Sequence, residues 1–411
     1  MSVNLNFPHY PLIPIPMIDR DVRKLIEEFN CDRNPEILTR KYANLRKNAF
    51  TFFRGTCHLF YQSLPTILTQ TLAPSVWICG DLHLENFGTY KGDDRQIYFG
   101  INDFDEGALA PCTWDLARLV TSIFLAANDL ALAPVDATRL AKTYLDSYGK
   151  ALATGRIRAI VADNAHGIVE KLLLNLQQRK RLDLLTERTE LIKESRHLRF
   201  DKDKVLKTGK QLEQQITEAI KTWGSNQPNP DFYQVLDIGF RIAGTGSLGL
   251  DRYLILVTGK GSPNHNYLLD LKEQPNSALQ PYLTTEQPTW INQATRVIKV
   301  QQLVQSASPA LVAAIELNGK SYFLRELQPS QDKISLKADK YSFEQLNDLI
   351  DLMAQVTAST HLHGSGKSGA AIADELMAFG NNLAWKAEIL THACQCAIQV
   401  RLDYQNFCTP T

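Results

Sequence analysis

Hydrophobic residues in the N-terminal part of the chain follow two different periods. Apolar residues three or four positions apart predict helices over four segments: 18–29, 35–64, 113–132 and 134–148. Two short runs, 76–79 and 97–101, are apolar throughout, which is typical of buried strands. This part of the chain is therefore predicted to be mostly helical, with two short strands between the helices.

The charged segment 168–223 is predicted to form long helices. Between residues 171 and 222 it carries 13 basic and 8 acidic side chains. We interpret these charges as a solvated helical face, and the alternative is a docking surface for an acidic substrate. Residues 224–230, Gly-Ser-Asn-Gln-Pro-Asn-Pro, are typical of a linker. The sequence therefore predicts a domain boundary at this segment.

Beyond residue 230 apolar and polar residues alternate, which predicts an antiparallel sheet. Five strands are expected, at 235–243, 252–257, 267–272, 311–317 and 322–327, with a helix over 290–305 between the third and the fourth. Asn318-Gly319 is the favoured two-residue turn of a hairpin. Helices over 341–364 and 369–404 follow. The expected fold class is therefore α+β: a mostly helical domain at 1–223, a small antiparallel-sheet domain at 231–328, and C-terminal helices at 329–411 that return to the first domain.

Polar side chains follow both of the predicted N-terminal strands. Asp81 and Asn86 come after the first strand, and Asp103 comes after the second. An Asp followed five residues later by an Asn on a tight loop can meet a substrate hydroxyl while the Asn carbonyl turns toward a metal. Mg²⁺ prefers such hard oxygen ligands. These residues could instead be ordinary turn residues, but the convergence of two strand ends favours a phosphoryl-transfer site.

A second candidate site is the glycine-rich segment Gly244-Thr245-Gly246-Ser247-Leu248-Gly249. Its spacing is weak evidence alone, because a dinucleotide-binding fold uses the same spacing before a helix. Here a strand follows, so the glycines are predicted to form a hairpin whose backbone amides lie over ATP phosphates. Lys272, on the next strand, would contact the α and β phosphates. The alternative for Lys272 is a surface lysine beside Glu273.

The two polar loops resemble those of a known superfamily. Residues 80–86, Gly-Asp-Leu-His-Leu-Glu-Asn, and 103–105, Asp-Phe-Asp, are similar to motifs of the aminoglycoside phosphotransferase and choline-kinase-like branch of the protein-kinase superfamily. The resemblance implies a two-lobed kinase-like fold. It also implies a role for each motif residue: Asp81 as the catalytic base, Asn86 and Asp103 as Mg²⁺ ligands, and His83 at a loop position often held by a basic residue.

Two features depart from that superfamily's usual pattern. The loop at Asp81 precedes the glycine-rich segment at Gly244, whereas the small lobe usually comes first, so a circular permutation is predicted. The predicted helix 290–305 lacks an obvious Glu to pair with Lys272. The candidates for that pairing are Gln301, Gln302 and Glu286. The hinge between lobes is expected near residues 325–329, whose backbone would meet adenine.

Further motifs resemble a large bacterial family catalogued only as domain of unknown function 2252. These motifs are Phe53-Arg54-Gly55, 80–88, 102–106 and 114–118. The resemblance covers most of the chain and implies no substrate. Arg54 is predicted either to reach a phosphate oxygen or to tie a helix to a loop. Asp105 is a further candidate for phosphate or substrate contact, and Asp115 is expected to be structural, bracing the catalytic loop.

The composition limits the kinds of molecule that the protein is expected to bind. The 411 residues include 44 basic and 44 acidic side chains, so charge implies neither a nucleic acid nor a membrane surface. Residues 1–16 lack the basic and apolar pattern of a signal peptide, and no run of about 18 apolar residues occurs. Seven cysteines without repeated spacing favour reduced thiols and a cytoplasmic location.

These features lead to one main hypothesis and two alternatives. The main hypothesis is an ATP- and Mg²⁺-dependent phosphotransferase acting on a small-molecule hydroxyl. The first alternative is a nucleotide-binding pseudokinase that acts as a docking or regulatory protein, favoured by the missing Glu and the charged helices. The second is a nucleotidyl transferase that moves AMP on the same fold. The acceptor and the oligomeric state are not predicted.

Overall fold

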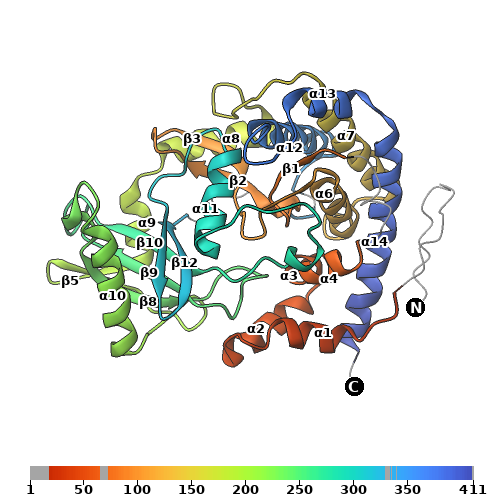
Figure 1. Cartoon of the computed structure of the whole chain (residues 1–411). Coiled ribbons are helices and arrows are strands. Elements are labelled where there is room, and N and C mark those ends of the chain that lie inside the picture. The colour runs from red at the N-terminus through yellow and green to blue at the C-terminus, as the bar shows by residue number, and fades with distance from the viewer. Residues whose placement is uncertain (1–17, 65–72, 329–333, 335, 339, 410–411) are drawn as a thin grey trace.

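The computed structural model describes residues 18–64, 73–328, 334, 336–338 and 340–409. The protein is a mixed α+β structure with a small antiparallel sheet, as the sequence predicted. Helices from both ends of the chain pack together on one side, and a six-stranded sheet lies on the other (Figure 1). We call the first part, α1–α4, α6, α7 and α12–α14 with strands β1–β4, the helical region. The second part, β7–β12 with α10, is the sheet region.

The helical region begins with four short helices: α1 (Val22–Phe29), α2 (Pro35–Leu45), α3 (Ala49–Gly55) and α4 (Cys57–Gln62). The prediction of one helix over 35–64 is therefore wrong. Asn48 interrupts it, because its side chain accepts a hydrogen bond from the backbone N–H of Thr51 and so caps a new helix. Arg54 of α3 forms an ion pair with Glu85, which places α3 beside the loop that follows β1 (Ser75–Ile78).

Two small antiparallel ladders follow. β1 (Ser75–Ile78) pairs with β4 (Ala108–Pro111), and β2 (Phe87–Lys91) pairs with β3 (Ile97–Ile101). The two predicted N-terminal strands, 76–79 and 97–101, are thus confirmed to within a residue at each end. They bring the segments 79–86 and 102–107, which carry the predicted polar loops, to one side of the helical region.

The core of the helical region is built around α6 (Thr113–Ala126), whose side chains are all buried. Around it lie α7 (Pro134–Ala153), α12 (Phe343–His363), α13 (Ala373–Asn381) and α14 (Ala384–Cys408). The helix predicted over 369–404 is two helices, because an irregular segment separates α13 from α14. None of the described helices combines the length and hydrophobicity that a membrane-spanning helix requires.

The predicted long helical segment 168–223 is only partly helical. It contains α8 (Gly167–Gln178), α9 (Arg181–Arg188), a hairpin of β5 (Thr189–Ile192) and β6 (Ser195–Leu198), β7 (Val205–Leu206) and α10 (Lys210–Gly224). Ile216 and Ile220 of α10 pack against one face of the six-stranded sheet. Apolar residues that precede the segment 224–230 therefore form part of the core of the sheet region.

The sheet has the strand order β11-β12-β10-β9-β8-β7. Its remaining strands are β8 (Val235–Arg241), β9 (Arg252–Val257), β10 (Tyr267–Glu273), β11 (Ala313–Leu317) and β12 (Lys320–Glu326). The five predicted strands and the hairpin at Asn318-Gly319 are confirmed, with positive φ angles of 52° and 75° at the two turn residues. Such angles suit Asn and Gly and match the twist of the flanking strands.

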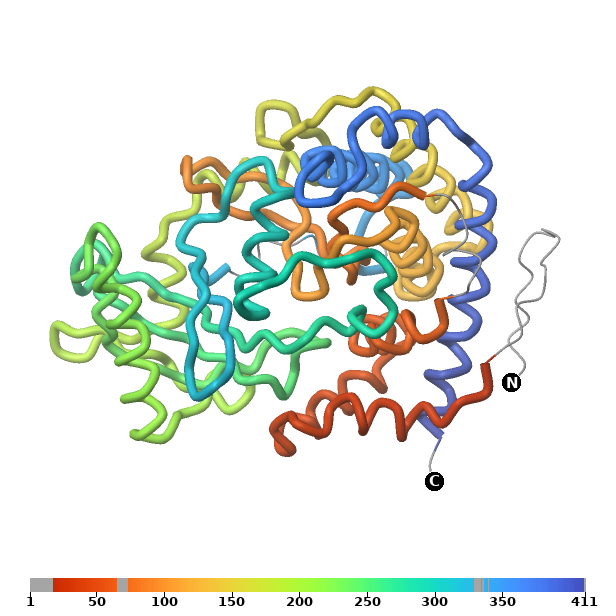
Figure 2. Tube along the Cα trace, in the orientation of Figure 1, coloured from red at the N-terminus to blue at the C-terminus, as the bar shows by residue number. Residues whose placement is uncertain are grey.

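The sheet and helical regions are connected by the segment 274–292 and by α11 (Gln293–Val304). Figure 2 shows the chain crossing after β10 to the helical region and returning to α11. α11 packs against β11 and β12 on one side and against α12 and β1 on the other. Of the predicted hinge 325–329, Pro329 lies outside the described residues.

Candidate functional site

The loop that follows β1 is held by Asp115 at the start of α6. The two carboxylate oxygens of Asp115 accept hydrogen bonds of 3.0 Å from the backbone N–H groups of Cys79 and Gly80. Gly80 has a φ of +80°, and a Cβ atom there would lie 2.4 Å from the carbonyl oxygen of Glu106. Only glycine fits this conformation and close approach. The expected structural role of Asp115 is thus confirmed.

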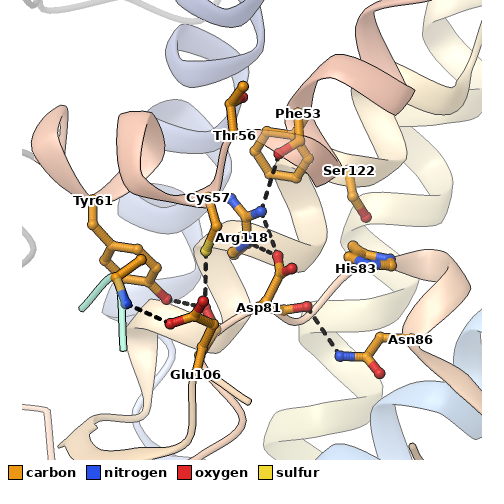
Figure 3. Close-up of polar contacts among 12 residues, drawn as sticks. Phe53, Thr56, Cys57, Tyr61, Asp81, His83, Asn86, Glu106, Arg118 and Ser122 are labelled. Carbon is orange, nitrogen blue, oxygen red and sulfur yellow. Dashed lines mark hydrogen bonds and ion pairs between the residues drawn. The ribbon is translucent and has the colours of Figure 1, made fainter. Parts of the chain in front are cut away.

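Asp81 is oriented by a buried arginine that the sequence did not single out. Arg118 Nε of α6 lies 2.5 Å from Asp81 Oδ1, and Arg118 also donates to the carbonyl of Phe53 (Figure 3). Its guanidinium lies 4.0 Å from the centre of the Phe53 ring. Burial raises the pKa of Asp81, whereas the charge of Arg118 opposes that rise. The Asp81 side chain is 24% exposed and accessible from the cleft described below.

Asn86 and His83 shape the rest of this loop. Asn86 Nδ2 donates to the carbonyl oxygens of Asp81 at 3.1 Å and Asp103 at 3.3 Å. With its nitrogen so placed, Asn86 Oδ1 is buried without a hydrogen-bond partner. The buried His83 accepts a hydrogen bond at Nδ1 from the backbone N–H of Glu85. His83 therefore contributes to the geometry of the loop, and Figure 3 shows it beside Asp81 and Asn86.

The loop at 103–106 meets the sheet region through Lys272 of β10. Lys272 forms an ion pair with Asp105 and lies 3.8 Å from Asp103. It thus takes its carboxylate partner from this loop and not from the segment 286–302 that supplied the sequence candidates. Burial, followed by the charge of Asp103, raises the pKa of Asp105 to about 6. The Asp103 side chain is 51% exposed, and its Oδ1 accepts from the N–H of Asp105.

Two further contacts fix the same loop to the crossing segment and α11. Glu106 Oε2 accepts hydrogen bonds from Ser277 Oγ at 2.7 Å and from the N–H of Ala278 at 2.6 Å. Arg296 of α11 donates to the carbonyl oxygens of Asp105 and Gly107. Neither Glu106 nor Arg296 was predicted, because these contacts join segments far apart in the chain.

The glycine-rich segment forms a turn between the antiparallel strands β8 and β9, as predicted. The carbonyl oxygen of Gly246 accepts from Lys41 Nζ at 2.7 Å and from Arg33 at 2.5 Å. Burial lowers the pKa of Lys41 well below its ordinary value, with the charge of Arg33 acting in the same direction. A Cβ atom on Gly246 would lie 3.3 Å from the carbonyl oxygen of Arg54. The turn therefore rests directly on the N-terminal helices.

A cleft of about 350 Å³ lies between these loops. Its lining includes the following residues predicted from the sequence: Arg54, Asp81, His83, Asn86, Asp103, Asp105, Gly244, Thr245, Gly246, Ser247 and Lys272. Gly249 lies outside this lining, packs against Arg33 and Leu38, and accepts a hydrogen bond from the N–H of Asn34. Arg54 is ion-paired with Glu85, so it ties α3 to the loop after β1.

The oxygen atoms of the residues that line the cleft are of a type that suits Mg²⁺. Asn86, Asn102 and Gln274 are among the residues that line the cleft, and their carboxamide oxygens are buried without hydrogen-bond partners. Asp103 adds an exposed carboxylate nearby. Within the described ranges no cluster of three or more His, Cys, Asp or Glu side chains could hold a metal. The donor set therefore consists of carboxamide and carboxylate oxygens, and Mg²⁺ commonly uses one or two such groups together with phosphate oxygens.

The cleft also contains a cluster of arginines that the sequence analysis missed. Arg241, Arg252 and Arg325 surround the buried carboxylate of Asp270. Although burial raises it, the pKa of Asp270 is held well below its ordinary value by Arg241 and Arg252. One sequence signal could have found this cluster. Asp270 and Lys272 alternate with leucines on a strand, which places both charged side chains on one face.

Fold and site define an α+β protein with a polar cleft between a helical region and an antiparallel sheet. The family model described as "Uncharacterized protein conserved in bacteria (DUF2252)" matches residues 33–410, and the chain belongs to this family. Searches of the curated proteins and of the solved structures found no match to this chain.

Proposed function

We propose that this protein is an ATP- and Mg²⁺-dependent phosphotransferase that acts on a hydroxyl group of a small molecule. One observation carries the proposal: two loops near residues 81 and 103 and the turn at 244–247, distant in sequence, line a single cleft with Lys272. Turn residues without a shared function have no reason to converge in this way. The proposed fold is kinase-like and circularly permuted, with the sheet region as its small lobe.

Asp81 is proposed to accept the proton of the attacking hydroxyl. Its ion pair with Arg118 keeps the carboxylate in one orientation, and burial offsets part of the loss of basicity that this cation causes. Arg118 thus acts as a positioning residue. The partial exposure of Asp81 toward the cleft leaves room for a hydroxyl group to approach.

Lys272 and the glycine-rich turn are proposed to bind the phosphates of the nucleotide. The Gly246 carbonyl points toward Lys41, so the N–H of the same trans peptide unit, on Ser247, points away from Lys41. Backbone N–H groups in such turns are suitable donors to phosphate oxygens. Lys272 would exchange its contact with Asp105 for a phosphate, since all of these groups border the same cleft.

The metal is proposed to bind at Asn86 Oδ1 and Asp103. The two carbonyl acceptors of Asn86 Nδ2 orient its oxygen, which the rest of the described chain leaves without a partner. When bound, Mg²⁺ would neutralise the charge that develops on the phosphoryl oxygens.

The pseudokinase alternative is favoured by one observation. Lys272 is already paired with Asp105, and α11 contributes Arg296 and no carboxylate to this loop. If ATP does not displace this ion pair productively, the cleft would bind nucleotide without turnover. Transfer of AMP, the third hypothesis, uses the same residues and differs only in the product.

The test combines binding and turnover. Isothermal titration should show Mg²⁺-dependent binding of ATP to the wild-type protein, and Asp103→Ala should weaken it by about tenfold or more because a charged ligand is lost. Asp163→Ala, at an exposed loop position, should leave affinity within about twofold and serves as the control. Unchanged affinity in Asp103→Ala would remove the proposed metal site.

Turnover against a broad set of hydroxyl compounds distinguishes the three hypotheses. Phosphoryl transfer adds about 80 Da to the acceptor, whereas AMP transfer adds about 329 Da, and mass spectrometry separates them. Binding of Mg²⁺-ATP without either product would favour the pseudokinase. Asp81→Asn should abolish turnover and retain binding, because it removes the base and leaves the proposed metal ligands in place.

A further inference from the structure

The cleft-facing side of the sheet carries a row of charged residues. On β10, Leu269 and Leu271 face the core beneath α10, so Asp270 and Lys272 face the opposite side. Lys272 lies across from Arg252 of β9, and Asp270 lies across from Arg325 of β12. Directly opposed residues share one face of a sheet. Both arginines therefore point to the same side as Lys272.

The arginines around Asp270 are in excess of the negative charge. Asp270 accepts from Arg252 at 2.8 and 2.5 Å, lies 2.7 Å from Arg241, and lies 3.6 Å from Arg325. Three positive charges thus face one negative charge. A carboxylate offers about four acceptor sites, whereas each guanidinium carries about five N–H donors. The three guanidinium groups therefore carry more N–H donors than the Asp270 carboxylate can accept.

These arginines are accessible from the cleft. The side chains of Arg241 and Arg325 are each 20% exposed, and both line the cleft with Arg252 and Arg188. Arg188 of α9 has a buried Nε without a hydrogen-bond partner. Burial lowers the pKa of Arg241 to about 10, and the neighbouring cations act in the same direction, so an additional anion here would relieve repulsion.

We infer that Arg241, Arg252 and Arg325 around Asp270, together with Arg188 from the lining of the same cleft, form a second phosphate-binding subsite. It lies beside Lys272 on the sheet, because Asp270 and Lys272 are two residues apart, or about 6.6 Å along a strand. Guanidinium groups bind phosphate oxygens through paired hydrogen bonds, and several together select a dianion. This inference rests on the proposed function, in which Lys272 and the glycine-rich turn bind the phosphates of the nucleotide.

The phosphate can come from two sources. A phosphorylated acceptor would place its phosphate at the arginines and its hydroxyl near Asp81. Alternatively, the nucleotide's own phosphates extend along the sheet from Lys272 to the arginines. Both sources share the same chemistry, and competition separates them.

The primary test is titration of the full-length protein with inorganic phosphate in EDTA, without nucleotide. We expect one phosphate to bind, with affinity reduced about tenfold or more in Arg325→Gln and Arg241→Gln, since each loses a charge-assisted contact. Arg40→Gln removes the same charge from an arginine outside the cleft and should change affinity by less than about twofold. Absence of phosphate binding, or equal effects of all three variants, would overturn the inference.

Circular dichroism and thermal melting check that each variant folds. If removal of Arg241 or Arg325 unfolds the sheet, Arg188→Gln provides the decisive measurement, because Arg188 is 21% exposed and its ion-pair partner is the neighbouring Glu187. Weaker phosphate binding in Arg188→Gln would support the subsite, and unchanged binding would overturn it.

The source of the phosphate is found by repeating the titration with a non-hydrolysable ATP analogue and Mg²⁺ at saturation. Persisting phosphate binding assigns the subsite to the acceptor, and loss of binding assigns it to the nucleotide.

The metal-free phosphate titration tests the subsite without requiring catalysis. Arginine-dependent phosphate binding without any turnover would therefore contradict the proposed phosphotransfer alone, whereas turnover without phosphate binding would contradict the subsite alone.

Discussion

Asp115 illustrates how single buried residues determine the geometry of the loop that carries Asp81. Both of its oxygens accept backbone N–H groups, and His361 Nε2 lies 3.4 Å from Oδ2. Its side chain is fully buried. A carboxylate in this position can accept from two backbone donors at once, which an amide cannot do without turning its NH₂ group toward one of them.

We therefore expect Asp115→Asn to lower the free energy of unfolding by about 2–3 kcal/mol, because one buried backbone donor loses its acceptor. Urea denaturation would measure the change. Asp146→Asn is the matched control, since it breaks a surface ion pair with Lys386 and should cost less than about 1 kcal/mol. Equal effects of the two substitutions would contradict the role assigned to Asp115.

His392 of α14 predicts a pH dependence of stability. Its side chain is buried, and burial lowers its pKa to about 4. Its ordinary pKa is about 6.5, so between these values the unfolded chain binds more protons than the folded protein. The free energy of unfolding should therefore fall as the pH drops from about 6.5 toward 4, by up to about 1.4 kcal/mol per pH unit from this residue.

Comparison with His392→Leu isolates this effect, because the raised pKa values of Asp81 and Glu106 act in the opposite direction in both proteins. The variant should lose stability less steeply in urea titrations between pH 7.5 and 5. Identical slopes for the two proteins would show that His392 is protonated without cost in the folded state.

At the scale of elements, the corner between α1 and α2 clamps the glycine-rich turn. Arg33 and Lys41 both donate to Gly246, and Lys41 also donates to Asn30 at 2.8 Å. Lys41 is fully buried and has no carboxylate ion-pair partner among the described residues, which is unusual for a lysine. The contact links elements that are about 200 residues apart in the chain.

Lys41→Met is expected to make the glycine-rich turn more mobile. The aliphatic stem is retained while the donor to Gly246 is lost, so amide hydrogen exchange of residues 243–250 should accelerate by about fivefold or more. Lys47→Met, at an exposed position just after α2, should leave exchange unchanged. If exchange at 243–250 is equal in both variants, Arg33 alone is sufficient to hold the turn.

The helices and strands that were predicted correctly are those whose sequence pattern lies within the element itself or in an adjacent turn. Strands β8–β12 were found because their alternation and the Asn318-Gly319 turn are local patterns. The prediction of one continuous helix over 35–64 was wrong because Asn48 caps a new helix there. The prediction of long helices over 168–223 was wrong because β5 and β6 are short and carry polar residues, and because β7 has only two residues and pairs with the distant strand β8.

At the scale of the whole molecule, the described ends of the chain lie in the same region. The backbone N–H of Ile18 donates to Gln399 of α14 at 2.9 Å, and α14 ends at Cys408. The turn after α10, at Ser225 and Asn226, is exposed. Exposed turns tolerate new chain ends, and neighbouring ends can be joined by a linker.

A permuted chain that starts at Asn226, joins the original ends through a flexible linker and stops at Ser225 should therefore fold. It would place most of the sheet region before the helical region, with α10 returning at its C-terminus. We expect circular dichroism and Mg²⁺-ATP binding similar to those of the natural order. A permutant opened within α6 at Leu119, which is fully buried, should fail to fold and is the control.

The sequence by itself determined the α+β class, the strands at 235–327, and the polar loops with Asp81, Asn86 and Asp103, because these depend on residues close together in the chain. Only the tertiary structure decided that Lys272 pairs with Asp105, that Arg118 orients Asp81, and that three arginines surround Asp270. Arginines and carboxylates occur throughout the chain, and which of them meet depends on the packing of distant elements.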